Sequence, residues 1–297
     1  MQIFSKTNLF KLIGLISVAR VYNVLVLVIA QIFAAVFIFN ATAPLISTIN
    51  DVQLWLIVVA SACAITGGYI VNNFYDREKD LINRPQKTLL EQKVFDDKLW
   101  ILYFTLNFIS FGLGLLVSLR AGLFFAIYIF LLWFYSHKLK KITYIGDLMA
   151  AFVAILPFFA IFVYYKNFSI EIFFHAIFLF LILLTRELVK DFENLKGDLV
   201  LGYKTLPVAL GMKLAKYNLI AHLLITALVG VLMGTQLQVG DMKMYFFLSS
   251  ILLITNIGLV GSFKVKKQYL FLHNQLKLLI VLGVFCIVLI RYSFREI

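Results

Sequence analysis

The sequence has few charged residues and almost no cysteine. Charged residues make up 14% of the 297-residue chain, whereas hydrophobic residues make up 62%. Soluble domains carry about 25% charged and about 45–50% apolar residues, so this composition excludes an ordinary soluble domain. The two cysteines, Cys63 and Cys286, lie inside apolar runs, which supports neither a disulfide framework nor a thiolate metal site. We expect the length to be taken up by membrane spans.

Apolar runs long enough to cross a bilayer, roughly 17–25 residues each, recur along the chain. They lie near residues 14–39, 52–72, 99–119, 121–137, 146–165, 171–189, 214–235, 244–263 and 275–292. Only Arg120-Ala121-Gly122 separates the third run from the fourth. The first run is too long for the core of a signal peptide and has no convincing cleavage site. The sequence therefore predicts an all-α, polytopic membrane protein with nine transmembrane helices.

The distribution of positive charge supports this count and orients it. If the N-terminus is cytoplasmic, all but five of the 27 Lys and Arg residues fall in cytoplasmic segments. The exceptions are Arg120, Lys166, Lys243, Arg291 and Arg295. Because cytoplasmic loops normally carry the excess of Lys and Arg, we expect an inner-membrane protein with a cytoplasmic N-terminus and an external C-terminus. The net charge of +12 then reflects topology and lipid headgroups, not nucleic acid.

An acidic stretch follows the second run. It reads Asn72-Asn73-Phe74-Tyr75-Asp76-Arg77-Glu78-Lys79-Asp80. Its residues Asn72, Asp76 and Asp80 are spaced i, i+4, i+8, so a helix places all three on one face. Ionised carboxylates are costly against lipid tails and usually face a polar cavity. This face is the first candidate site.

A second polar face follows the sixth run, where Asp191, Asn194 and Asp198 are spaced i, i+3, i+7. Oxygen ligands without His or Cys suit a hard cation such as Mg²⁺, which is usually bound by one or two carboxylates together with substrate phosphates. The four histidines are scattered, and none is assigned a metal. Basic residues flank both faces: Arg77, Arg84, Lys87, Lys190 and Lys204. The pattern predicts a magnesium–diphosphate clamp; the alternative is a set of salt bridges in a hydrated loop.

Both motifs resemble those of a known family. Asn72-x-x-x-Asp76-x-x-x-Asp80 followed by Asn83-Arg84-Pro85 resembles the first aspartate-rich motif of the UbiA superfamily of intramembrane prenyltransferases. The second motif is matched by Asp191-x-Glu193-Asn194-x-x-Gly197-Asp198 and then Gly202-x-Lys204-Thr205-Leu206-Pro207. The resemblance covers essentially residues 1–297 as one domain. It implies nine helices around a central cavity that opens to the cytoplasmic side, capped by loops at about 73–98 and 190–213.

The resemblance also implies a reaction and a set of roles. Members bind a prenyl diphosphate through Mg²⁺, ionise its allylic C–O bond and join the carbocation to a hydrophobic acceptor. The implied metal ligands are Asn72, Asp76, Asp80, Asp191, Asn194 and Asp198. The implied diphosphate contacts are Arg77, Arg84, Lys87, Lys140, Lys190 and Lys204. The implied substrate contacts are Asn23, Tyr135 and Asp147.

Several of these residues have structural alternatives. Asn23 could instead form a helix–helix hydrogen bond, Lys140 could be a topology lysine, and Tyr135 an interfacial side chain. Asp147 is either an acceptor-side base or a helix cap. Two positions depart from the family pattern. Asn194 stands where many members have Asp, and Lys87 keeps a positive charge where the usual Arg would offer a fork of donors.

The acceptor is the least constrained part of the prediction. Arg186-Glu187-Leu188-Val189-Lys190-Asp191-x-Glu193 is most similar to family members that act as geranylgeranylglyceryl phosphate geranylgeranyltransferases. This favours a lipid-like acceptor in ether lipid synthesis. The alternative is prenylation of an aromatic or quinone precursor. A non-enzymatic transporter or lipid carrier would need charges spread through the membrane and broken helices at its midplane. The acidic residues here cluster at one side instead.

Overall fold

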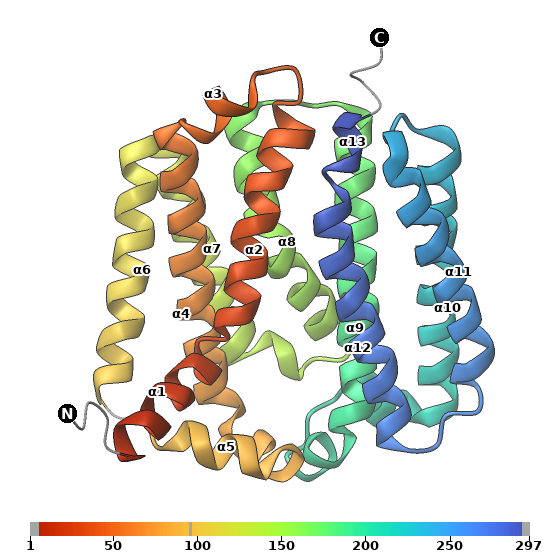
Figure 1. Ribbon diagram of the computed structural model, residues 1–297. Coiled ribbons are helices and arrows are strands. Elements are labelled where there is room, and N and C mark those ends of the chain that lie inside the picture. The colour runs from red at the N-terminus through yellow and green to blue at the C-terminus, as the bar shows by residue number, and fades with distance from the viewer. Residues whose placement is uncertain (1–5, 95–96, 293–297) are drawn as a thin grey trace. The chain divides into compact units, whose positions relative to one another are not determined.

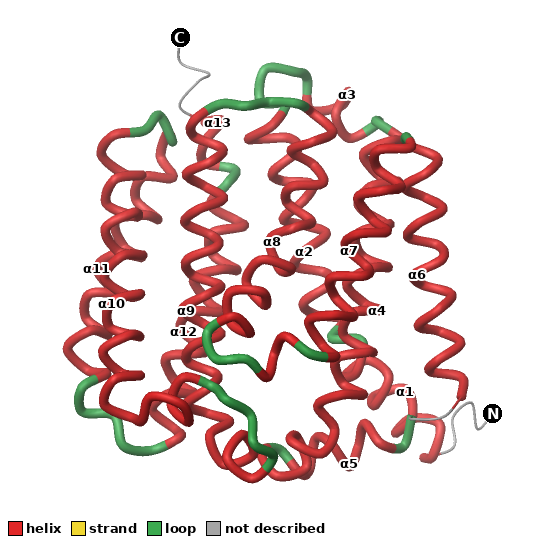
Figure 2. The backbone as a smooth tube through the Cα atoms, turned by 180° about the vertical axis from the view of Figure 1, so that it is seen from behind, coloured by secondary structure: helices red, strands yellow, loops and turns green. Residues whose placement is uncertain are grey.

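The computed structural model describes residues 6–94 and 97–292, and these described residues form helices and loops without a strand (Figures 1 and 2). Within them, nine helical segments are long and apolar enough to cross a membrane, which confirms the predicted number. These candidate spans are Val21–Phe39, Val52–Asn83, Lys98–Val117, Leu119–Lys141, Ile145–Tyr165, Ile170–Val200, Leu206–Gln236, Gly240–Val260 and Lys266–Cys286.

The helices divide into two compact units. The first is drawn from Met1–Val28 and Trp55–Leu139, and the second from Ile29–Leu54 and Lys140–Ile297. In chain order the elements are α1 (Lys6–Val18), α2 (Val21–Ala34), the π-helical turn η1 (Ala35–Phe39), α3 (Leu45–Ile49), α4 (Val52–Asn83), α5 (Pro85–Gln92), α6 (Asp97–Val117), α7 (Leu119–His137), the 3₁₀ turn η2 (Leu139–Lys141), α8 (Ile145–Tyr165), α9 (Ile170–Val200), α10 (Leu206–Gln236), η3 (Gly240–Met242), α11 (Lys243–Val260), α12 (Lys266–Cys286) and α13 (Leu289–Tyr292).

The first unit differs from the sequence prediction at its start. The run at 14–39 was expected to form one helix, but the helix is interrupted between α1 and α2. Arg20 lies at the break with φ of 47°, a left-handed conformation that a continuous α-helix does not contain. Its guanidinium lies 4.9 Å from the centre of the Tyr69 ring. The first span therefore begins at Val21, and α1 packs against α5 at the same end of the unit (Figure 1).

The turn between α6 and α7 is tight, as the sequence predicts, but its position differs. It lies at Ser118 rather than at Arg120-Ala121-Gly122. The Ser118 hydroxyl accepts a hydrogen bond from the Ala121 N–H at 3.1 Å and caps α7. Gly122 lets the two helices approach closely, because a Cβ there would clash with the Leu115 side chain.

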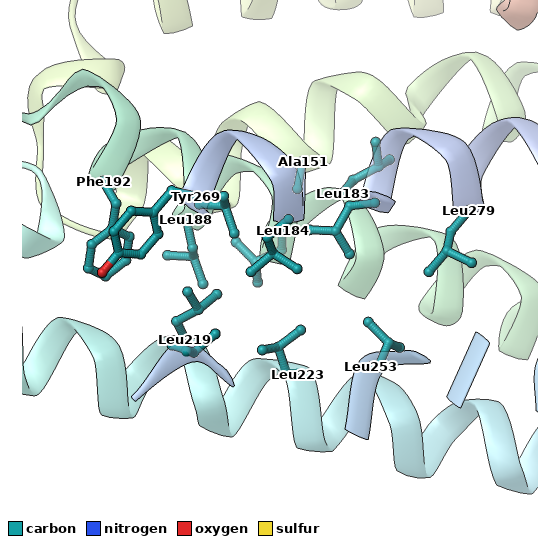
Figure 3. Close-up of a cluster of buried hydrophobic side chains, with 14 of the residues drawn as sticks. Ala151, Leu183, Leu184, Leu188, Phe192, Leu219, Leu223, Leu253, Tyr269 and Leu279 are labelled. Atoms are coloured by element: carbon teal, nitrogen blue, oxygen red, sulfur yellow. The ribbon is translucent and has the colours of Figure 1, made fainter. Parts of the chain in front are cut away.

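The second unit is built around α9, which packs against α8, α10 and α12. Figure 3 shows the buried cluster that joins these helices with α11. Leu184 and Leu188 of α9 face Leu219 and Leu223 of α10 in this cluster. At one end of it, the rings of Phe192 and Tyr269 stack 4.6 Å apart. The polar end of α9 thus continues directly from a packed apolar core.

The two segments expected as loops, 73–98 and 190–213, are largely helical. α4 continues to Asn83 and is followed by α5, while α9 continues to Val200 and α10 begins at Leu206. Hydropathy ends each span where the polar residues start, but Asp, Glu and Lys do not stop a helix. Pro85 and Pro207 lie in the first turns of α5 and α10, where a missing N–H costs nothing. Both acidic motifs therefore lie on rigid helices.

Candidate functional site

The first motif lies on one face of α4, as its spacing predicts. The Asn72 side-chain amide donates to Asp76 Oδ2 at 2.8 Å. Lys79 Nζ lies 3.7 Å from Asp76 Oδ1. Asn72, Asp76 and Asp80 are all half-buried. The face presents amide and carboxylate oxygens of the kind that Mg²⁺ prefers.

Three cations of the same unit interact electrostatically with Asp80. The positive charges of Arg84, Lys79 and Arg20 attract its carboxylate, whereas the negative charge of Asp76 repels it. Arg84 lies just before α5, and its N–H donates to the Asp80 carbonyl at 2.7 Å. Arg77, in contrast, is exposed. Arg84 is thus held beside the acidic face, in a position that suits the predicted diphosphate contact.

Glu91 is a buried acid that the sequence analysis did not single out. Its side chain is 2% exposed. Oε1 accepts from the Ser17 hydroxyl at 2.5 Å, and Oε2 accepts from the Asn73 amide at 2.9 Å. Lys87 Nζ lies 3.4 Å from Oε1. Glu91 therefore ties α5 to α1 and α4, and Lys87, predicted to contact diphosphate, is paired with it here.

The second motif is buried at the end of α9. Asp191, Asn194 and Asp198 are 8%, 8% and 1% exposed. Asp191 Oδ2 accepts from the Leu206 N–H at 3.2 Å, at the start of α10. Asp198 Oδ2 accepts from the Thr205 hydroxyl at 3.4 Å. A carboxylate at a helix N-terminus is favourable for both the N–H groups and the helix dipole. The motif therefore also fixes the segment 201–205.

Two predicted lysines of the second unit lie on segments that are bonded together. The Lys204 N–H donates to the Lys141 carbonyl at 3.2 Å, and the Thr143 hydroxyl donates to the Lys204 carbonyl at 2.5 Å. Lys140 is buried at 8% exposure. Gly146 makes this packing possible, because a Cβ there would lie 3.0 Å from the Lys140 carbonyl oxygen. The structure thus brings the segments of Lys140 and Lys204 together.

Other charged side chains near the second motif are paired with one another. Lys190 Nζ contacts Glu187 Oε2, and Arg186 Nη2 lies 3.3 Å from Glu187 Oε1. On another side of α9, Glu193 Oε1 lies 2.5 Å from His273 Nδ1 of α12, and both side chains are buried. Lys190, predicted to contact diphosphate, is engaged by Glu187. Glu193 holds α9 to α12, a role that its place in the motif did not reveal.

The start of α8 holds a further polar group. Tyr144 has φ of 63°, a conformation that costs a residue other than glycine about 1–3 kcal/mol. Its hydroxyl lies 2.8 Å from His222 Nε2. Burial and the nearby charge of Asp147 raise the pKa of the Tyr144 hydroxyl above its ordinary value. Asp147 itself is buried in the first turn of α8.

The remaining predicted contacts, Asn23 and Tyr135, are half-buried. Asn23 lies in the first turn of α2, where its N–H donates to the Arg20 carbonyl at 2.8 Å. Tyr135 lies near the end of α7. Among the described residues of each unit, no three His, Cys, Asp or Glu side chains converge as a metal cage. The oxygen donors fit Mg²⁺ in its usual mode, in which substrate phosphates complete the coordination.

Known proteins resemble the chain over most of its length. Residues 28–269 match the UbiA prenyltransferase family. The chain belongs to the UbiA prenyltransferase family. This confirms the family predicted from the two motifs, and with the candidate spans it makes the chain an integral, multi-pass membrane protein.

Two relatives within the family carry the same name. The digeranylgeranylglyceryl phosphate synthase of Thermococcus gammatolerans is 36% identical over 168 residues, which cover 55% of this chain and 58% of the relative. The synthase of that name from Pyrococcus furiosus is 32% identical over 206 residues, which cover 68% of this chain and 70% of the relative. The chain thus spans less than two thirds of the length of the Thermococcus relative.

Solved structures of UbiA proteins share the fold. A structure described as digeranylgeranylglyceryl phosphate synthase in membranes has a TM-score of 0.70 at 21% identity, covering 95% of this chain and 99% of that one. A UbiA homologue from Archaeoglobus fulgidus, bound to GPP and Mg²⁺, has a TM-score of 0.65 at 17% identity, covering 93% and 99%. The predicted all-α fold is thereby confirmed.

Proposed function

We propose that this chain transfers an isoprenyl group from a prenyl diphosphate to a lipid-like acceptor, with Mg²⁺ as cofactor. The observation that carries the proposal is the pair of polar helix faces on α4 and α9, each built from carboxylate and amide oxygens with basic residues on the same or adjoining segments. Membership of the UbiA family supports it. The relative bound to GPP and Mg²⁺ supports the choice of ligands.

The chain's residues divide into two roles. Asn72, Asp76 and Asp80 would bind metal from α4, and Asp191, Asn194 and Asp198 from α9. Arg84, Lys140 and Lys204 are the basic residues that we favour for binding diphosphate oxygens, since the backbone N–H groups of Arg84 and Lys204 are hydrogen-bonded next to the motifs and Lys140 is buried. Lys87 and Lys190 are secondary candidates, because they are paired with Glu91 and Glu187, and Arg77 is a further exposed candidate. Bound at these residues, Mg²⁺ would act as a Lewis acid and would stabilise the charge on the leaving diphosphate.

The reaction breaks the allylic C1–O bond, and the electron pair leaves with the diphosphate. Arg84, Lys140 and Lys204 stabilise that developing negative charge as preorganised donors. The apolar side chains of the spans exclude water, which would otherwise quench the allylic cation. The acceptor then bonds to C1, and the group that forms this bond loses its proton. Asn23 and Tyr135, half-buried near helix ends, are the proposed contacts to the substrate.

A lipid-like acceptor is favoured over an aromatic one by the relatives. Those from Thermococcus and Pyrococcus are both named digeranylgeranylglyceryl phosphate synthase. We therefore assign geranylgeranylglyceryl phosphate, or a glyceryl phosphate lipid of that chemistry, as the acceptor. We infer that the active site opens to the cytoplasm, because basic residues flank the acidic motifs of α4 and α9.

The purified protein in lipid nanodiscs tests the proposal. Radiolabelled geranylgeranyl diphosphate is mixed with Mg²⁺ and with a glyceryl, an aromatic or a quinone-precursor acceptor, and the products are separated. We expect a prenylated glyceryl ether that disappears when EDTA removes Mg²⁺. Asp241→Asn is the matched control, because Asp241 is an exposed carboxylate of η3 far along the chain from both motifs. The absence of a Mg²⁺-dependent product from every acceptor would contradict the proposal.

A further inference from the structure

One polar pair in the second unit is not explained by metal or diphosphate binding. It consists of Tyr144, immediately before α8, and His222 of α10, which are 78 positions apart in the sequence. Figures 1 and 2 show that α8 begins part-way along the length of α9 rather than at its end. Tyr144 is half-buried and packs against the apolar cluster of its unit.

The hydrogen bonds of His222 fix its proton. Nδ1 lies 3.0 Å from the Asn218 carbonyl, which can only accept, so Nδ1 carries the hydrogen. Nε2 is then an acceptor in the neutral ring, and the Tyr144 hydroxyl donates to it at 2.8 Å. His222 is 8% exposed, so its ring is largely shielded from bulk water. The pair is therefore a phenol aligned on a proton acceptor.

The same hydrogen bonds determine whether the Tyr144 oxygen can donate or accept a further hydrogen bond. Its hydrogen is committed to His222, so its lone pairs remain to accept a hydrogen bond. A group that binds there must carry an O–H or N–H donor. Tyr144 is half-buried rather than sealed, and its backbone is held at φ of 63°. Strained backbone conformations of this kind cluster at active sites and ligand-binding sites.

We propose that Tyr144 and His222 bind and deprotonate the hydroxyl group of an alcohol acceptor. This inference rests on the proposed prenyl transfer and assigns its acceptor class: an alcohol that is converted to an ether. Tyr144 contacts the acceptor, and His222 acts through Tyr144. Asp147, on the same segment, interacts electrostatically with Tyr144 and helps to balance the positive charge that the pair acquires.

The proton transfer balances with the bond changes. The acceptor oxygen bonds to C1 of the prenyl group, while the C1–O bond to diphosphate breaks and the diphosphate takes the electron pair. The acceptor's O–H proton passes to the Tyr144 oxygen, and the original Tyr144 proton passes to Nε2 of His222. His222 becomes an imidazolium and later releases the proton to water. An aromatic ring carbon has no such hydroxyl at the bond that forms.

Two variants test the pair. Tyr144→Phe removes the hydroxyl, and His222→Gln keeps a hydrogen-bond acceptor but cannot accept the proton. Two matched controls make the same changes elsewhere. His175→Gln alters a half-buried histidine that also bonds to a carbonyl four residues earlier, at 2.7 Å. Tyr164→Phe removes a hydroxyl that donates to Asp51 at 2.6 Å.

Each variant is assayed for transfer to glyceryl phosphate lipid and for Mg²⁺-dependent hydrolysis of geranylgeranyl diphosphate without acceptor. General-base catalysis contributes about 10²–10⁴-fold, so we expect transfer by Tyr144→Phe and His222→Gln to fall by at least about 100-fold. Hydrolysis and the KM for the diphosphate should stay within about twofold of the wild type, because ionisation does not use the pair. The controls should keep both activities.

Four results would overturn the inference, and they are distinguishable. Transfer by both variants at the control rate would show that the pair takes no part. Equal losses of transfer, hydrolysis and thermal stability would make the pair a structural hydrogen bond between helices. If the wild type prenylates ring acceptors but no alcohol, the acceptor class is wrong while the transferase stands. If the wild type neither transfers nor hydrolyses with Mg²⁺, the proposed function itself fails.

Discussion

The polar faces on α4 and α9 differ in how their side chains are held. On α4, Asp76 is half-buried and bonded within its own helix, to Asn72 at 2.8 Å and Lys79 at 3.7 Å. On α9, Asp191 and Asp198 are buried and bonded to the segment that leads into α10. The α4 face is organised by successive turns of one helix, whereas the α9 face also positions another element.

Because of this difference, substitutions on α4 can separate the effect on the reaction from the effect on stability, whereas truncation of a carboxylate on α9 cannot. In the first unit, the segment after the motif is held by Glu91, which bonds to Ser17 and Asn73 and lies outside the motif. In the second unit, the motif carboxylates themselves hold the segment 201–205. A substitution on α4 should therefore affect the reaction alone. The equivalent substitution on α9 should affect both the reaction and the stability.

Asp76→Asn should have the largest effect on the rate with little effect on stability. The change removes one ligand charge at nearly constant volume, so we expect prenyl transfer to fall by at least about 100-fold. Its ion pair with Lys79 contributes little, and the melting temperature should move by no more than about 2 °C. Rate and melting temperature are measured on the same nanodisc sample beside Asp241→Asn. Activity within threefold of wild type would remove Asp76 from the site.

Asp198→Ala should lower both the rate of prenyl transfer and the melting temperature. The loss of a metal ligand reduces transfer to a similar extent, and the buried Thr205 hydroxyl loses its acceptor, which costs about 1–3 kcal/mol. The expected fall in melting temperature is a few degrees. Asp198→Asn can still accept from Thr205, so it should restore the melting temperature but not the rate. An unchanged melting temperature in Asp198→Ala would contradict the claim that the α9 face, unlike the α4 face, also stabilises the fold.

Glu91→Ala should affect mainly stability. Glu91 is 2% exposed, and its removal leaves the half-buried Ser17 hydroxyl and Asn73 amide, together with the exposed Lys87, without their common acceptor. This loss costs about 1–3 kcal/mol. Transfer should fall only about threefold, since the α4 face keeps its own hydrogen bonds. Thermal unfolding followed by tryptophan fluorescence, with the rate measured well below the transition, separates the two effects. A 100-fold loss of rate in a stable protein would instead place Glu91 in the site.

Asn194→Asp should have the smallest effect of the four substitutions, and it should strengthen Mg²⁺ binding. Asn194 is 8% exposed on the face of Asp191 and Asp198, where an added carboxylate repels its neighbours unless a cation is bound. We expect the Mg²⁺ concentration for half-maximal transfer to fall about two- to fivefold, with a slightly lower melting temperature in EDTA. A Mg²⁺ titration checks this. A higher Mg²⁺ requirement would show that residue 194 does not face the metal.

The sequence predicted the parts of this structure that depend on local patterns. Apolar run length predicted nine candidate spans, and i, i+4, i+8 spacing placed Asn72, Asp76 and Asp80 on one face, because both follow from helix geometry. Hydropathy failed at the ends of the spans. It merged α1 with α2 across Arg20 and assigned 73–83 to a loop, since it measures transfer to lipid and not helix formation.

Pairings between distant segments could not be predicted. The contact of Tyr144 with His222 joins residues 78 positions apart, and that of Glu193 with His273 joins residues 80 positions apart. Nothing in the local sequence around these residues indicates a partner. Glu91 illustrates the same limit, because only its pairing with Lys87 follows from i, i+4 spacing. The motifs locate the metal ligands, but folding determines which acids serve structure instead.

The most direct test of the account is a double-mutant cycle on geranylgeranyl diphosphate binding in the presence of Mg²⁺. The dissociation constant is measured by calorimetry for the wild type, Asp76→Asn, Asp198→Asn and the double variant. If both faces hold the same magnesium–diphosphate, each single change loses most of the Mg²⁺-dependent affinity, and the double variant binds no more weakly than the worse single one. Independent, additive losses in binding free energy would contradict a shared site.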